Sequence, residues 1–155
     1  MYVYEKTLLY ACKNIKEAIK ENEKIIKYSA LSSKFSNASC EKLAEKILIY
    51  VDEKSKLIEL KNLLRDIVKN FSPEEKKLFA CKYLGKKLTF NEFSKRQYYR
   101  NQQKLLKNFS STLKIFNLDE KTFMDKYKNI PYIKLIYDYV KYKDSPYNNR
   151  AKKTA

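Results

Sequence analysis

Histidine and tryptophan are absent from the chain, and glycine occurs once. Without histidine there is no imidazole to act as a general base or metal ligand near neutral pH. A single glycine excludes the glycine-rich loops that hold phosphate in nucleotide-binding motifs. Acid pairs such as Glu74–Glu75 and Asp119–Glu120 stand at predicted helix starts, where capping accounts for them. We therefore expect no enzyme activity, no cofactor and no metal.

Cysteine is scarce and long apolar runs are missing. Cys12, Cys40 and Cys81 lie far apart without C-x-x-C spacing, as expected for small buried residues in a reducing compartment. The longest apolar run, residues 47–51, is far too short to cross a bilayer. The first residues lack the basic leader and long apolar region of a signal peptide. We expect a soluble cytoplasmic protein that does not enter a membrane.

So few helix breakers predict an all-α fold, a multi-helix bundle. Apolar residues at three-to-four spacing predict a helix over about 3–28, then a loop, then a long helix capped by Ser39 and ending near residue 69. Ser72 and Pro73 predict the start of another helix, with Glu75 completing a capping box. Gly85 is expected to end that helix in a left-handed conformation.

Downstream of Gly85, Thr89 is expected to open one brief helical turn, and Ser94 to cap a basic helix that runs to Phe116. Further helices are expected after Asn117 and from Pro131. The predicted regions are an N-terminal region of two helices (1–70), a helix-turn-helix-like segment (71–117), C-terminal helices (118–142) and a basic disordered tail (143–155).

The chain has 34 basic and 18 acidic residues, a net charge of +16, which favours polyanionic partners. Thirty of the basic residues are lysine, and the abundance of Asn, Ile and Tyr is typical of AT-rich codons, so an evenly spread charge would be weak evidence of function. The charge is uneven, however. Residues 1–70 carry a net +4, whereas residues 85–114 carry +7 with Glu92 as their one acid.

The basic helix has two distinct faces at about 100° per residue. The inward stripe comprises Tyr98, Gln102, Leu105, Phe109, Leu113 and Phe116. The outward face comprises Arg96, Arg100, Gln103 and Lys107, flanked by Lys95, Gln97, Asn101 and Lys104. An ordinary solvated helix would mix in glutamate for pairing, but no acid occurs from Lys95 to Lys114. The pattern favours nucleic-acid contact. The alternatives are a surface helix made basic by codon bias, an acidic protein partner and a lipid surface.

Residues 72–85, SPEEKKLFACKYLG, followed by residues 94–109, SKRQYYRNQQKLLKNF, resemble the helix-turn-helix of sigma-factor region four and of small phage-type regulators of Firmicutes. In that family an acidic, capped helix precedes a serine-capped recognition helix. The resemblance implies that Ser94 to Lys104 enter the major groove, with Lys86 and Lys87 near the DNA backbone.

The sequence therefore predicts a DNA-binding transcriptional regulator whose partner is duplex DNA, with RNA polymerase or another protein left open as a further partner. Arg96, Gln97 and Arg100 are expected at base edges, and Tyr99 against a base. The full predicted set is Lys86, Lys87, Ser94, Lys95, Arg96, Gln97, Tyr99, Arg100, Asn101, Lys104 and Lys107. Two alternatives stay open. One is a helical protein–protein adaptor with an apolar patch on the 39–69 helix or the C-terminal helices, and the other is an RNA-binding protein.

Overall fold

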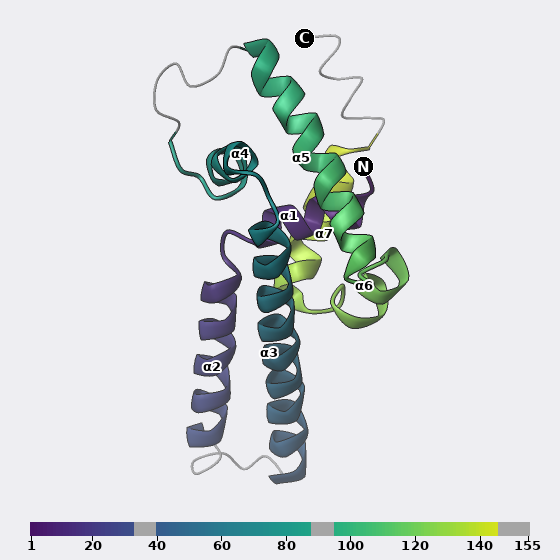
Figure 1. The fold of residues 1–155 in the computed structure, drawn as a ribbon. Helices are drawn as coiled ribbons and strands as arrows, with labels where there is room; N and C mark the ends of the chain where they lie inside the picture. The colour runs from purple at the N-terminus through teal and green to yellow at the C-terminus, as the bar shows by residue number, and fades with distance from the viewer. Residues whose placement is uncertain (33–39, 88–94, 146–155) are drawn as a thin grey trace. The chain divides into compact units, whose positions relative to one another are not determined.

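The computed structural model describes residues 1–32, 40–87 and 95–145 (Figure 1). These residues form seven α-helices and no β-strand, which confirms the predicted all-α fold. The helices are α1 (Val3–Ala11), α2 (Ile15–Ser32), α3 (Cys40–Lys69), α4 (Pro73–Tyr83), α5 (Lys95–Ile115), α6 (Glu120–Lys126) and α7 (Pro131–Lys143). None of these helices is long and apolar enough to cross a membrane.

The chain divides into two compact units. The body comprises Met1–Lys13 together with Leu63–Ala155, and the hairpin comprises Asn14–Asn62, which holds α2 and most of α3. This division does not follow the predicted boundary at residue 70. The reason is that α1 packs against α7, so the two ends of the sequence belong to one unit.

The prediction of a single helix over 3–28 is wrong, because the structure has two helices there. The first ends at Ala11, and the second begins at Ile15, where Asn14 C=O accepts from the N–H of Ala18 at 3.0 Å. A contact with α7 explains the break. The Tyr132 hydroxyl donates to Ala11 C=O at 2.7 Å, and this carbonyl is the one that a continuous helix would bond to Ile15.

The start of α4 is confirmed as predicted, with Ser72 Oγ accepting from Glu75 N–H at 3.2 Å and Pro73 at the first position. Gly85 follows the helix with φ of +72°, also as predicted. The Glu75 side chain, by contrast, is directed to α5, where its carboxylate accepts from Asn108 Nδ2 at 2.8 Å. The predicted caps at Ser39 and Ser94 and the turn at Thr89 lie outside the described residues.

The core of the body surrounds α1, of whose nine residues six are buried. Leu8 and Leu9 are fully enclosed, as are Phe109 of α5 and Phe123 of α6. Phe71 lies edge-on to Phe79 at 5.7 Å and to Phe109 at 6.4 Å between ring centroids. These rings fix α4 against α5, a pair of helices in direct contact.

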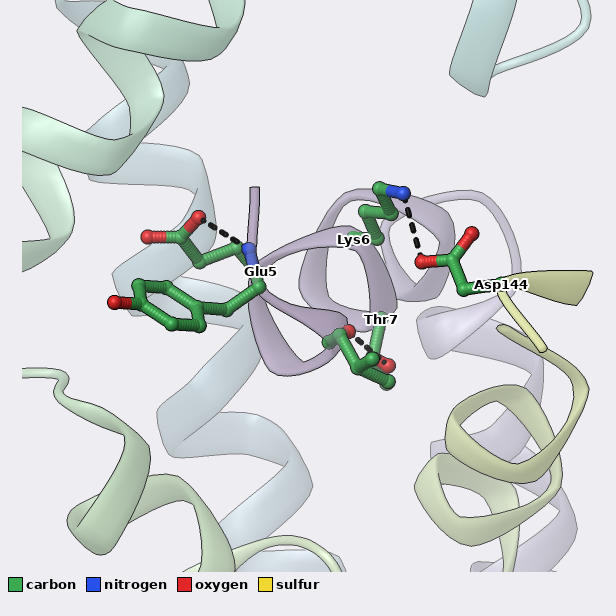
Figure 2. Close-up of polar contacts among 6 residues, drawn as sticks. Glu5, Lys6, Thr7 and Asp144 are labelled. Carbon is green, nitrogen blue, oxygen red and sulfur yellow. Dashed lines mark hydrogen bonds and ion pairs between the residues drawn. The ribbon is translucent and has the colours of Figure 1, made fainter. Parts of the chain in front are cut away.

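Polar side chains of α1 tie it to α5 and to the residue directly after α7, and Figure 2 shows the second of these contacts. Glu5 is buried, and its Oε2 accepts from Tyr2 N–H at 3.2 Å and from Ser110 Oγ of α5 at 3.1 Å. Lys6 leaves α1 in another direction and pairs with Asp144, directly after α7, at 2.8 Å. This short helix therefore holds the middle of α5 and the end of α7 in one unit.

Candidate nucleic-acid interface

The basic helix forms as predicted, as α5, and its inward stripe anchors it to the body. Leu105, Phe109 and Leu113 are fully buried, while Tyr98, Gln102 and Phe116 are half-buried. The apolar anchors begin at Leu105, so the first turns of α5 carry few buried side chains. Lys95, Arg96, Gln97, Tyr99 and Arg100 are all exposed.

The outward face of α5 is exposed along its length. Arg96, Arg100, Gln103 and Lys107 all face solvent, and so does the flanking Lys104. Within the described part of the chain, none of the basic residues of α5 forms an ion pair with a carboxylate. Their positive charge is therefore not neutralised by an ion pair with any acid that the structure describes.

The expectation that Asn101 flanks the outward face is wrong, because its side chain is only 7% exposed. Asn101 lies four residues before Leu105 and eight before Phe109, so the helical repeat places it on the buried face. Its Nδ2 is buried without a hydrogen-bond partner among the described residues. Asn101 is therefore excluded from the interface, and the spacing to Leu105 is the signal that would have shown it.

Lys86 and Lys87 follow Gly85 and are both exposed in the link after α4. The backbone of this link is fixed at its start, since Lys86 N–H donates to Ala80 C=O at 3.0 Å. Ser94, the predicted cap of α5, lies outside the described residues. The structure therefore places nine of the eleven predicted residues on the exposed surface of the body, on α5 or directly after α4.

Two tyrosines at the start of α5 have different surroundings. The Tyr99 ring is 57% exposed and lies edge-on to Tyr98, with centroids 5.8 Å apart. Burial raises the pKa of Tyr98, and the neighbouring Cys81 of α4 contributes to the increase. Tyr98 is therefore the half-buried ring of the pair, on the side of α4, and Tyr99 is the ring presented to solvent.

Lys13 is a basic residue near this surface that the sequence did not indicate. A Cβ atom on Gly85 would lie 3.2 Å from Lys13 Nζ, so the ammonium group lies directly beside the end of α4. It adds an exposed charge next to Lys86 and Lys87. No local pattern could have shown this proximity, because 72 residues separate Lys13 from Gly85.

Comparison of the chain with protein-family models, with curated proteins and with solved structures gives no match in any of the three.

Proposed function

We propose that this chain is a DNA-binding transcriptional regulator that acts in the cytoplasm and contacts duplex DNA with the outward face of α5. The supporting observation is the exposed, acid-free face that carries Arg96 and Arg100. Arginine is suited to bidentate contact with guanine or phosphate, because its guanidinium group presents a planar fork of donors. The helix diameter of about 10–12 Å also matches the width of about 12 Å of the major groove.

The residues of the face divide into two roles under this proposal. Arg96, Gln97 and Arg100, near the start of α5, contact base edges, and Tyr99 lies against a base or sugar. The lysines contact phosphates and set affinity rather than sequence preference. This second group comprises Lys86, Lys87, Lys95, Lys104 and Lys107, joined by Lys13.

The distribution of charge between the two units supports the same surface. The body carries 24 basic and 10 acidic residues, whereas the hairpin carries ten and eight. A strongly basic body attracts a polyanion, and its affinity for DNA falls steeply with salt because bound counterions are released from the DNA.

The test is fluorescence anisotropy with labelled duplex DNA. Arg96→Ala with Arg100→Ala should weaken binding by about 2–5 kcal/mol if both side chains make good contacts. The matched control is Lys134→Ala with Lys141→Ala, which removes the same charge from exposed positions on α7. The control should change affinity much less. Equal weakening in both variants would show that net charge, and not α5, determines binding.

A protein–protein adaptor is the second candidate, because apolar side chains are exposed on α3 and on α7. Leu48 of α3 is 65% exposed and Leu135 of α7 is 73% exposed. Recovery of one stoichiometric partner after nuclease treatment, without binding to duplex DNA, would favour this function. An RNA-binding function is distinguished by a competition experiment. Unlabelled duplex DNA and unlabelled single-stranded RNA are each tested for how well they displace the labelled duplex from the protein.

A further inference from the structure

The hairpin has exposed apolar side chains and almost no core. Among its described side chains at positions 20–31 and 40–56, none is buried. The same positions nevertheless contain ten large apolar residues: Ile25, Ile26, Tyr28, Leu31, Leu43, Ile47, Leu48, Ile49, Tyr50 and Val51. Two helices alone give each other one line of contact, so half of these residues stay exposed: Tyr28, Leu31, Leu48, Ile49 and Val51.

The contacts between α2 and α3 show which side of α3 is already used. Asn22 Nδ2 donates to Tyr50 C=O at 3.4 Å, and Glu23 pairs with Lys54 at 3.2 Å. A second stripe runs beside this side of α3 at helical spacing and comprises Ala44, Leu48, Val51 and Ser55. Leu48 and Val51 are 65% and 43% exposed. The apolar surface of α3 is thus wider than one neighbouring helix covers.

The two helices of the hairpin differ in the charge that they expose. On α3, an acidic line lies next to the second stripe and comprises Glu41, Glu45, Asp52 and Glu59. At about 100° per residue, these four positions span an arc of about 40° around the helix. On α2, an exposed basic line comprises Lys16, Lys20, Lys24 and Lys27. The hairpin is therefore nearly neutral as a whole, with a line of exposed carboxylates on α3 and a line of exposed lysines on α2, although each helix also carries residues of the other sign.

We propose that the hairpin is a self-association surface whose partner is the hairpin of a second copy of this chain. The two hairpins pack face to face about a two-fold axis, with α3 of each copy on α2 of the other, as a four-helix bundle. This arrangement covers Leu48 and Val51 and places each acidic line against a basic line, twice by symmetry. The acidic line makes this surface of the hairpin unfavourable for a polyanion such as DNA. Self-association through the hairpin does not depend on the DNA-binding function proposed for α5.

The first experiment measures the mass of the full chain by sedimentation over about 1–100 µM protein. The chain should form a concentration-dependent dimer. Leu48→Asp with Val51→Asp should give a monomer with unchanged helical circular dichroism, because these exposed side chains contribute little to the fold of one copy. The matched control, Leu135→Asp with Tyr139→Asp, changes two exposed apolar residues of α7 in the body and should stay dimeric.

The second experiment tests the pairing of the charged lines. Glu45→Lys with Asp52→Lys places like charges against α2 of the partner and should weaken the dimer by about tenfold or more. Adding Lys24→Glu with Lys27→Glu to the same chain reverses the facing lysines and should restore the dimer, because the contacts Asn22–Tyr50 and Glu23–Lys54 set these positions at the same level along the hairpin. A chain that is monomeric at 100 µM, a control that dissociates as readily as the Leu48 variant, or a failure of the double reversal to restore association would each overturn the proposal.

Discussion

The body and the hairpin are built from similar amphipathic helices, yet they bury their apolar residues to very different extents. In the body, Phe109, Phe123 and Tyr127 are enclosed by several helices at once. Among the described residues of the hairpin, the buried apolar ones are Ile15, Ile19, Leu57 and Leu60, which all lie near the ends that join the body in sequence. Helical periodicity therefore creates an apolar face in both units, but burial depends on how many neighbouring helices are available to cover it.

The two units also differ in charge, and this difference bears on their partners. The body has more than twice as many basic as acidic residues, whereas the hairpin has ten and eight. A surface with one sign of charge attracts an oppositely charged ligand, while a surface with both signs can complement a copy of itself. The proposed DNA contact and the proposed self-association follow from these two charge distributions.

The strongest test of the comparison is the removal of one large side chain from each unit. Phe109→Ala in the body should lower the free energy of unfolding by about 3–5 kcal/mol, because it leaves a cavity in the core. Tyr28→Ala in α2, where the ring is 70% exposed, should lower it by less than about 0.5 kcal/mol. Urea unfolding followed by circular dichroism measures both values. Similar losses would mean that the hairpin has a core of its own.

A second test compares one carboxylate from each unit. Glu5→Ala leaves two donors, Tyr2 N–H and Ser110 Oγ, without their acceptor inside the body, and should destabilise the protein by about 2 kcal/mol. Glu23→Ala removes a largely exposed ion pair with Lys54 and should change stability by about 0.5 kcal/mol or less. Thermal unfolding measured at two salt concentrations separates the two losses of stability, because only the loss caused by Glu23→Ala should become smaller with added salt.

A third test concerns the left-handed residue that ends α4. Gly85→Ala should destabilise the body by about 1–2 kcal/mol, because φ of +72° is strained for any residue with a Cβ atom. Asn117→Gly is the control, since Asn117 has φ of 56° and glycine fits that conformation without strain. Hydrogen exchange should show the loss of protection in α4 and α5, and not in α2. Equal loss throughout the chain would argue against two units of independent stability.

The smallest expected effect is at Glu53 in the hairpin. Partial burial raises the pKa of Glu53, with Asn22 acting in the opposite direction, and its Oε2 atom is enclosed without a hydrogen-bond partner among the described residues. The protonated form therefore favours folding below about pH 4.5, and this contribution is lost as the pH rises through the raised pKa. Glu53→Gln should raise stability at pH 7 by at most about 1 kcal/mol, and a gain of the same size at pH 4 would contradict this account.

The sequence was sufficient for features that depend on local chemistry. The all-α class, the Ser72 cap, the left-handed Gly85 and the start of α7 at Pro131 all follow from residue type and helical spacing. The exposed positions of Arg96 and Arg100 follow from the same spacing, because the apolar anchors lie on the other side of α5.

Features that depend on contacts between distant segments could not be predicted. The break after Ala11 depends on Tyr132, and the charge beside Gly85 comes from Lys13. The direction of Glu75 depends on Asn108, which offers a donor from another helix. Asn101 is a different case. Its four-residue spacing to Leu105 already indicated the buried side of α5, but its polar side chain led to the wrong expectation that it flanks the outward face.

The chain path through the hairpin has a consequence for evolution and engineering. Residues 14–62 leave the body after Lys13 and return to it at Leu63, so the hairpin has the topology of an insertion into an otherwise continuous unit. Whole helical turns of about 3.6 residues can be added or removed at matched positions in α2 and α3 without altering the order of the elements that form the body. A change in hairpin length made in this way would leave the helix that carries Arg96 and Arg100 unchanged in sequence.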